Sequence, residues 1–212
     1  MKSKTAPLLV AITGGSGAGK SWLADQLQKK LGDKAVRISL DDFYRDRSHL
    51  SPASRARINF DHPRSIDWLS LERVLRDCLA WKTARIPQYD FATHARLPTT
   101  SALKPRPIIL MEGLWLLRRP SLRQMFGVRI FIECPTKIRL NQRMARDLLS
   151  RGRNQLSIKH QFWKTVEPMN ILYVVPQSKW AHIILKAPIR DSDVIHLAGQ
   201  LMAQIKMISR PR

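Results

Sequence analysis

The sequence predicts an α/β fold of three layers, in which a central, mainly parallel sheet carries helices on both of its faces. Two observations lead to this prediction. Short apolar runs of strand length alternate along the chain with segments of helical length, which is the pattern of parallel strands joined by crossover helices. One of the apolar runs, residues 107–117 (PIILMEGLWLL), is almost continuously hydrophobic, as expected for a strand that is buried on both faces.

The first half of the chain contains two predicted strands and two predicted helices. Residues 7–13 (PLLVAIT) read as the first strand, and a helix over residues 20–31 follows a glycine-rich loop and ends at Gly32. Residues 35–40 (AVRISL) read as the second strand. A helix is predicted over residues 68–82 because its apolar side chains recur at helical spacing and therefore share one face.

The second half repeats the alternation. The apolar run 107–117 is followed by a second strand over residues 128–135 (VRIFIECP) and by a basic helix over residues 137–150. A strand over residues 182–187 (HIILKA) and a closing helix over residues 193–208 complete the pattern. These elements predict helices on both faces of one parallel sheet.

Length, composition and charge limit the class of protein. A chain of 212 residues with 44% hydrophobic residues is expected to form one globular domain over residues 1–212. No apolar run approaches the roughly 20 residues of a membrane-spanning helix, so no membrane partner is expected. The two cysteines have no metal-site spacing, which predicts a reduced, cytoplasmic protein. The net charge of +21 predicts attraction to polyanions, but it does not distinguish nucleic acid, a membrane surface and nucleotide phosphates.

Residues 14–21 (GGSGAGKS) match the phosphate-binding P-loop pattern, between a predicted strand and a predicted helix. Small side chains let backbone N–H groups and the helix N-terminus surround phosphate oxygens. We expect Lys20 to reach the β- and γ-phosphates of a nucleoside triphosphate and the Ser21 hydroxyl to ligate Mg²⁺. A glycine-rich turn without a ligand is the alternative. The predicted nucleotide-binding residues are Gly14, Gly15, Ser16, Gly17, Ala18, Gly19, Lys20 and Ser21.

Carboxylates stand at the ends of two predicted strands, where parallel sheets bind ligands. Asp41 and Asp42 end one strand. Asp41 could accept a proton from an attacking hydroxyl, or it could equally be a helix N-cap or a turn aspartate. Glu112 follows a buried run and therefore requires a cation, for which Mg²⁺ held through Ser21 is expected and a structural arginine is the alternative. Asp41 is expected beside the same metal.

Arginines are concentrated in the predicted basic helix and just after it. Their spacing of four and three places the first three on one helical face. A glycine between the last two breaks the helix, so a mobile lid over residues 139–155 could close over the triphosphate. A solvated basic face is the alternative. The arginines are Arg139, Arg143, Arg146, Arg151 and Arg153.

Six motifs together resemble one family. They are GGSGAGKS, SLDDFY, NFDHP, IPQYDFATHAR, LMEGLWLL and RMARDLLSRGR. Their order and spacing over about residues 8–187 are similar to those of uridine kinase (uridine–cytidine kinase), a P-loop nucleoside kinase. The resemblance implies a three-layer P-loop fold and phosphorylation of uridine or cytidine at the 5′-hydroxyl, with ATP or GTP as donor and Mg²⁺, in pyrimidine salvage. It also implies a homo-oligomer, and it does not imply nucleic-acid binding despite the positive charge.

The same resemblance implies roles for individual residues. Asp41 matches the base toward the 5′-hydroxyl, and Arg146 and Arg151 match lid arginines that reach the phosphates. With Lys20, these are the expected catalytic residues. The residues expected around the nucleoside are Tyr44, Phe60, Asp61, Tyr89, Phe91, His94, Arg143, Arg153 and Gln161.

Residues 86–97 (IPQYDFATHARL) are too polar for a core strand and too aromatic for a solvent loop. By resemblance they form the wall that grips the pyrimidine, within a nucleoside-binding insertion over about residues 43–100. Aromatic side chains can pack against a flat base, while His94 and Tyr89 bond to its edge.

Two residues depart from the family pattern. Asp42 stands where a small residue or serine is more usual. Its carboxylate either raises the pKa of one member of the Asp41–Asp42 pair or points away from Asp41. Trp22 replaces a small or hydroxyl residue after Ser21. Related P-loop kinases that act on ribulose phosphate, pantothenate or nicotinamide riboside are alternatives, but they are expected to lack the NFDHP and YDFATHAR pair. A nucleic-acid-binding P-loop protein is the alternative outside the kinases.

Overall fold

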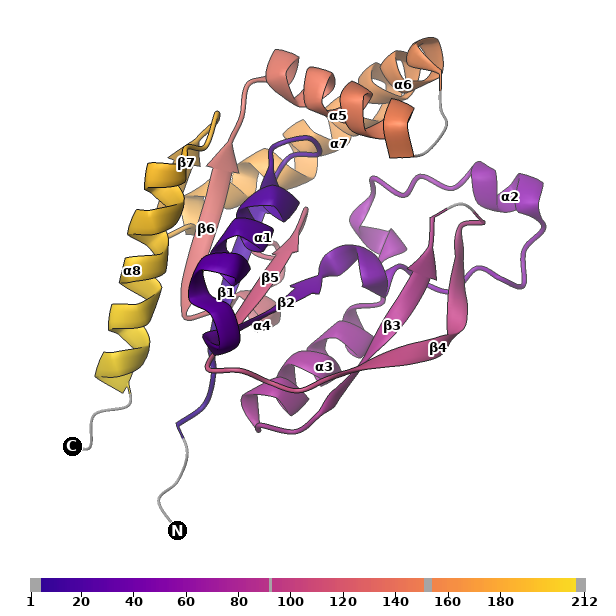
Figure 1. Ribbon diagram of the computed structural model, residues 1–212. Coiled ribbons are helices and arrows are strands. Elements are labelled where there is room, and N and C mark those ends of the chain that lie inside the picture. The colour runs from indigo at the N-terminus through magenta and orange to yellow at the C-terminus, as the bar shows by residue number, and fades with distance from the viewer. Residues whose placement is uncertain (1–4, 92, 151–153, 209–212) are drawn as a thin grey trace.

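The computed structural model describes residues 5–91, 93–150 and 154–208, and it has a parallel five-stranded sheet at its centre (Figure 1). The strand order is β2-β5-β1-β6-β7, and each neighbouring pair is parallel. The strands are β1 (Leu8–Gly14), β2 (Ala35–Ser39), β5 (Ile108–Gly113), β6 (Val128–Glu133) and β7 (Ile183–Lys186). The predicted α/β three-layer class is therefore confirmed.

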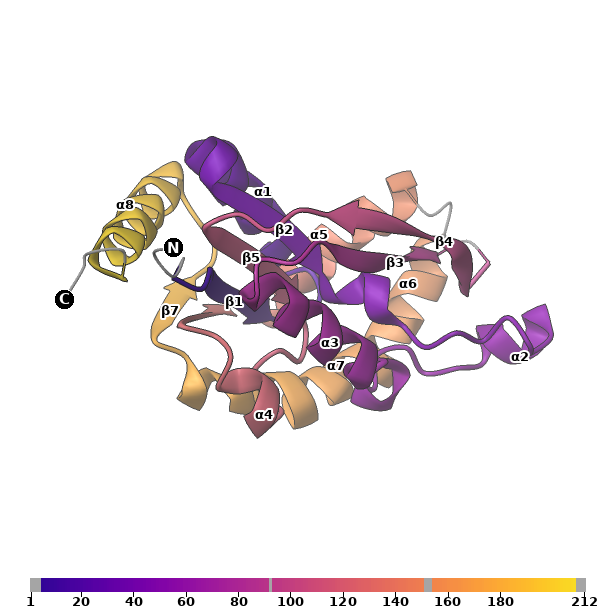
Figure 2. The same cartoon turned by 90° about the horizontal axis from the view of Figure 1, so that it is seen from below.

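Helices cover both faces of this sheet (Figure 2). On one face α1 (Lys20–Leu31) and α8 (Asp191–Ile208) pack on Val10, Ile12 and Ile130. On the other face α3 (Trp68–Leu79) and α4 (Pro120–Arg123) pack on a second apolar cluster. Every residue of β1 and β5 is buried, which is why those runs contain so few polar side chains.

The apolar run predicted as one strand over residues 107–117 is shorter than expected. Strand β5 ends at Gly113, and Trp115, Leu116 and Leu117 continue as a fully buried loop. The Leu114 carbonyl accepts hydrogen bonds from the Thr13 hydroxyl (3.1 Å) and a buried glutamine side chain, Gln177 (2.8 Å). The run is apolar because the loop is buried, not because the strand continues.

An antiparallel hairpin of β3 (Ala84–Asp90) and β4 (Ala95–Leu103) stands beside the main sheet (Figure 1). It accounts for the stretch 86–97, which combines the end of one strand, a turn and the start of the next. The short helix α2 (Pro52–Ala56) lies on the same side of the molecule, in the segment between β2 and α3.

A long and irregular helical segment crosses the carboxyl ends of the strands and then descends along the sheet. Helix α5 (Thr136–Ser150) is followed by α6 (Gln155–Gln161) and α7 (Glu167–Met169). Two π-helical stretches, Phe162–Val166 and Asn170–Val174, flank α7, and a 3₁₀ turn over Val175–Trp180 leads to β7. Among the described residues, no helix has the length and apolar character needed to cross a membrane.

Candidate active site

The P-loop joins β1 to α1 and has the backbone geometry that a phosphate cradle requires. Gly17 and Gly19 have φ values of 77° and 90°, in the left-handed region that side chains disfavour. Gly17 also leaves no room for a side chain, since a Cβ there would lie 2.3 Å from the Arg139 carbonyl oxygen. Gly19 precedes the first turn of α1 and makes no side-chain cap, so the helix N-terminus is left for phosphate oxygens.

Lys20 lies buried beneath this loop, where its ammonium donates a hydrogen bond to the Gly15 carbonyl (2.9 Å). Burial lowers the pKa of Lys20, while the nearby carboxylates of Glu112 and Asp41 oppose that shift. The lysine therefore reaches toward the phosphate cradle from a site with two acidic neighbours.

Glu112 is buried at the end of β5. Its Oε1 accepts a hydrogen bond from the Ser39 hydroxyl (3.0 Å) on the adjacent strand β2. Burial and then the Asp41 carboxylate raise the pKa of Glu112, while Lys20 lowers it. Within residues 5–91, 93–150 and 154–208 no arginine pairs with Glu112, so the structural-arginine alternative finds no support there.

Asp41 lies in a 3₁₀ turn over Leu40–Phe43, directly after β2. The cap of this turn is Ser39, whose Oγ accepts from the Asp41 backbone N–H (3.3 Å), so Asp41 itself is not the N-cap. The Asp41 side chain lines the same cavity as Lys20 and Glu112, whereas Asp42 does not line it. Burial and then the neighbouring Asp41 raise the pKa of Asp42 to about 6.

Two arginines of α5 face the P-loop. Arg143 donates to the Ser16 hydroxyl (2.8 Å) and to Oε1 of Gln161 (3.0 Å), and thus connects the P-loop to α6. Arg146 donates through Nε to the fully buried carboxylate of Asp147 (2.8 Å), which also pairs with Arg143 (3.4 Å). Asp147 therefore orients both arginines, a role that the sequence analysis missed.

Of the other three predicted arginines, the structure describes Arg139. Arg139 does not line the cavity of Arg143 and Arg146, because its guanidinium is buried on the far side of the P-loop and pairs with Glu167. The spacing of Arg139 and Arg143 correctly places them on one face of α5. The P-loop packs against that face between them, so their side chains enter different cavities. Arg151 and Arg153 lie outside the described residues. With Arg139 and Arg143 buried, the alternative of a solvated basic face is wrong for this part of α5.

Aromatic rings from three separate segments form one wall of the cavity. The rings of Phe60 and His94 are stacked, with centroids 4.7 Å apart and an interplanar angle of 14°. The ring centroid of Tyr44 lies 5.5 Å from that of Phe60 and 5.1 Å from that of Tyr89. The rings of Phe91 and Tyr89 meet edge to face, with centroids 5.3 Å apart. The residues that the sequence predicted around a nucleoside thus come together although they are far apart in the chain.

Tyr89 adds a polar group to this wall of the cavity, whereas Arg96 does not line the cavity. The Tyr89 hydroxyl is buried and has no hydrogen-bond partner in the described part of the chain, and burial raises its pKa to about 12. Arg96 donates to the Tyr44 carbonyl (2.8 Å) and pairs with Asp67 (3.3 Å), which fixes the hairpin against the segment after β2. Arg96 was not among the predicted site residues.

These groups enclose a single cavity of about 620 Å³, within the range of small-molecule sites. It extends from the P-loop and the carboxylates at one end to the aromatic wall at the other. Asp61 and Gln161 also line it. The predicted residues that line it are Ser16, Lys20, Ser21, Asp41, Tyr44, Phe60, Asp61, Tyr89, Phe91, His94, Glu112, Arg143, Arg146 and Gln161.

Comparison with known proteins identifies the family. The model of the phosphoribulokinase / uridine kinase family matches residues 9–194. The chain belongs to this family. A uridine kinase from Chloroflexus aurantiacus is 36% identical over 181 residues, covering 85% of this chain and 87% of the relative. A uridine kinase from Alkaliphilus metalliredigens is 34% identical and covers 97% of this chain and 98% of the relative.

A solved structure shows the same fold. Phosphoribulokinase from Rhodobacter spheroides aligns with a TM-score of 0.64 at 20% identity, over 87% of this chain and 71% of that chain. The resemblance seen in the sequence motifs is therefore confirmed at the level of the family. As a member of the phosphoribulokinase and uridine kinase family, the protein is a P-loop kinase that transfers a phosphoryl group from ATP to a small molecule.

Proposed function

We propose that this kinase transfers the γ-phosphoryl group of ATP or GTP to the 5′-hydroxyl of uridine or cytidine. The observation that carries the proposal is the cavity itself, in which the P-loop and two carboxylates face an aromatic wall with a buried, unpaired tyrosine hydroxyl. A flat base can contact the rings of Tyr44, Phe60 and Phe91, and a polar atom on its edge can satisfy Tyr89. Its 36%-identical relative named uridine kinase supports this acceptor.

Each end of the cavity has its own task in the reaction. Lys20 and Arg146 neutralise the phosphates, Arg143 contacts the nucleoside, and Asp41 accepts the proton of the 5′-hydroxyl. As that oxygen bonds to the γ-phosphorus, the bond from phosphorus to the β–γ bridging oxygen breaks, and the nucleoside diphosphate leaves. Asp61 is suited to the ribose hydroxyls, because a carboxylate can accept from two neighbouring donors. Arg151 and Arg153, outside the described residues, are proposed to complete the lid.

The residues present fit a Mg²⁺ ion. The Ser21 hydroxyl and the carboxylates of Glu112 and Asp41 line one cavity and are the oxygen donors that Mg²⁺ prefers. In the described residues no group of three His, Cys, Asp or Glu side chains could hold a metal alone. Ser21 and phosphate oxygens would therefore share the coordination with the two carboxylates. When bound, the ion would neutralise charge on the transferred phosphoryl group.

We further propose that the protein works in the cytoplasm on free nucleosides and as a homo-oligomer. The acceptor cavity has the size of a small-molecule site, which favours a free nucleoside over a nucleic-acid chain. Leu149, Leu156 and Trp163 expose large apolar side chains along α5 and the segment after it, which favours contact with another copy.

A substrate screen tests the proposal. ADP release with Mg-ATP should be fast with uridine and cytidine and slow with ribulose 5-phosphate, pantothenate and nicotinamide riboside. Asp41→Asn should lower kcat by about 10²–10⁴-fold with nucleoside affinity largely retained, and Asp42→Asn is the matched control that should stay active. Preference for another acceptor would overturn the assignment. Salt-dependent RNA or DNA binding without turnover of any nucleoside would favour the nucleic-acid alternative.

A further inference from the structure

His62 lies directly after two residues that line the cavity of about 620 Å³, Phe60 and Asp61, but it does not line that cavity itself. It is the N-cap of a short 3₁₀ turn, and its Nδ1 accepts a hydrogen bond from the backbone N–H of Arg64 (3.0 Å). The other ring nitrogen, Nε2, lies 3.1 Å from the hydroxyl of Tyr173 in the long helical segment. A turn does not need this second contact to be capped, so the contact requires another explanation.

The two contacts of the His62 ring determine where its proton lies. Because Nδ1 accepts from a backbone N–H, it carries no proton, and the proton of the neutral imidazole is on Nε2. Burial and then the positive charges of Arg64 and Arg118 lower the pKa of His62, which keeps the ring neutral at physiological pH. His62 therefore donates through Nε2 to the Tyr173 hydroxyl.

Tyr173 is held in place through both its backbone and its ring. The buried side chain of Gln177 donates to the carbonyls of Tyr173 (2.9 Å) and Leu114 (2.8 Å), which ties Tyr173 to the loop that follows β5. The Arg118 guanidinium lies over the Tyr173 ring, 4.6 Å from its centroid. The ring of His62 meets the Tyr173 ring edge to face, at an interplanar angle of 76°. The acceptor of the His62 proton is thus a fixed point.

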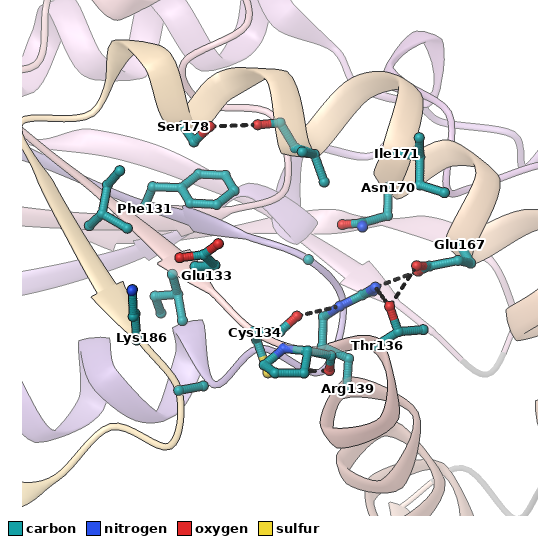
Figure 3. Close-up of a pocket in the computed structure, with 16 residues that line it drawn as sticks. Phe131, Glu133, Cys134, Thr136, Arg139, Glu167, Asn170, Ile171, Ser178 and Lys186 are labelled. Carbon is teal, nitrogen blue, oxygen red and sulfur yellow. Dashed lines mark hydrogen bonds and ion pairs between the residues drawn. The ribbon is translucent and has the colours of Figure 1, made fainter.

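The segment that carries Tyr173 also packs against the P-loop (Figure 3). Asn170, in the same π-helical stretch, lies so close that a Cβ at Gly15 would be 2.7 Å from its Oδ1. Just before it in the chain, Glu167 pairs with Arg139 of α5. The hydroxyl that His62 bonds is therefore fixed relative to the phosphate-binding loop.

The turn that begins at His62 shapes one end of the aromatic wall. The Phe60 carbonyl accepts from the hydroxyls of Tyr44 (3.3 Å) and Ser65 (3.3 Å). These bonds lie within residues 43–100 and fix the shape of the wall. The bond from His62 to Tyr173 leaves that part of the chain, and it sets where the wall lies relative to the P-loop.

We propose that His62 is a positioning residue for the acceptor, and that its hydrogen bond to Tyr173 holds Phe60 and Asp61 where the nucleoside can reach the phosphate site. This rests on the proposed function, in which Phe60 and Asp61 contact the nucleoside. His62 does not line the cavity, so it acts through the two residues before it. A displaced wall weakens the nucleoside contacts and leaves the ATP contacts in place. The loss should therefore appear in the KM for the nucleoside and not in the KM for ATP.

Three variants separate the bond to Tyr173 from the cap on Arg64. Tyr173→Phe deletes the acceptor hydroxyl alone. In His62→Asn, the amide oxygen is two bonds from Cβ, as Nδ1 is in histidine, so the cap is kept and the bond to Tyr173 is lost. In His62→Gln, the amide nitrogen is three bonds from Cβ, as Nε2 is in histidine, so the bond to Tyr173 is kept and the cap is lost.

Steady-state kinetics with uridine and ATP measure the effect in the whole protein. His62→Asn and Tyr173→Phe should each lower kcat/KM for uridine by about 3–10-fold, mainly through KM, with the KM for ATP within about twofold of wild type. His62→Gln should stay within about twofold of wild type for both substrates. The double variant of His62→Asn with Tyr173→Phe should be no worse than either single variant, because both changes remove the same bond.

Three results would overturn the proposal. The first is wild-type kcat/KM for uridine in Tyr173→Phe, which removes one oxygen from a half-buried residue and keeps the test decisive if a His62 variant does not fold. The second is a normal His62→Asn beside an impaired His62→Gln, which would make His62 the cap of its turn and no more. The third is an equal loss for uridine and ATP together with a lower Tm, which would make the pair structural.

Failure of the proposed function has a different signature, because the wild-type protein would then turn over another acceptor and not uridine or cytidine. The same variants are then compared with the acceptor that the wild type uses. A rise in the KM for that acceptor in Tyr173→Phe, with the KM for ATP unchanged, would support the positioning role. An unchanged KM for that acceptor would overturn it.

Discussion

Replacing Tyr89 with phenylalanine deletes one hydroxyl, and we expect opposite effects on the stability of the free protein and on nucleoside use. Tyr89 is 8% exposed, and its hydroxyl has no partner in the described ranges of the chain. An unpaired buried hydroxyl costs about 1–3 kcal/mol of folding free energy. Tyr89→Phe should recover part of that cost. Each kcal/mol corresponds to about 2–4 °C in a chain of this size, so Tm of the free protein should rise by ~2–8 °C.

Nucleoside use should fall in the same variant. If a polar atom of the base pairs with the Tyr89 hydroxyl, the deletion leaves that atom unpaired in a partly dry cavity. The cost of about 1–3 kcal/mol corresponds to a decrease of about 5–150-fold in kcat/KM for uridine. The KM for ATP should not change, because Tyr89 belongs to the aromatic wall and the P-loop lies at the other end of the cavity. Steady-state kinetics and thermal melting without ligand measure both effects.

Tyr44→Phe is the matched control, because it removes the same atom from the same wall. The Tyr44 hydroxyl donates to the Phe60 carbonyl (3.3 Å), so its loss should lower the stability of the free protein by about 0.5–1.5 kcal/mol. The two deletions should therefore shift Tm in opposite directions. A Tyr89→Phe protein that melts earlier than wild type, or that uses uridine as well as wild type, would refute the reasoning.

Three further predictions follow from the same geometry. The folded pKa of Asp42 is raised from 3.8 to about 6, so its protonation-linked stability is present below pH 3.8 and is lost as pH rises through about 6. Asp42→Asn should thus be more stable than wild type at neutral pH, by on the order of 1–2 kcal/mol after allowance for solvent screening. Near pH 4 the two proteins should be equally stable. Urea unfolding of both proteins at about pH 7 and about pH 4 measures the difference. His94→Ala should change the uridine-to-cytidine ratio of kcat/KM, since its ring stacks on Phe60 at the base wall, whereas an unchanged ratio with a lower Tm would make His94 structural. Lys20→Ala and Glu112→Gln should each abolish most turnover with Mg-ATP, and wild-type kcat in either variant would remove that residue from the site.

The sequence predicted those parts of the fold that depend on local pattern. Strand β1, helix α1 and the P-loop between them each have a local signature, in apolar runs, helical spacing or glycines. The carboxylates at strand ends were also predictable as neighbours, because parallel strands end at one edge of a sheet. The positions of Asp41 and Glu112 beside Lys20 follow that rule.

The parts that local pattern did not predict depend on contacts between distant segments. The stack of Phe60 on His94 joins two residues that are far apart in the insertion, and Arg96 holds the hairpin in place by donating to the Tyr44 carbonyl. The helical segment after α6 contains two π-helical stretches, whose period differs from that of an α-helix, so apolar spacing gave no clear signal. The separation of Arg139 from Arg143 arises because the P-loop packs between them.

The charges that line the cavity between the P-loop and the aromatic wall explain why we propose both a closing lid and a bound metal ion. The described side chains that line the cavity include three cations, Lys20, Arg143 and Arg146, and three carboxylates, Asp41, Asp61 and Glu112. The lining is thus balanced, although the whole chain has a net charge of +21. A triphosphate brings several further negative charges into a partly dry space, where uncompensated charge is costly. The described residues alone cannot neutralise it. Mg²⁺ held by Ser21, Glu112 and Asp41, together with the proposed lid arginines, would supply the missing positive charge only when the donor is bound. If the proposed lid and metal are right, these carboxylates would make closure of the site depend on metal and nucleotide together.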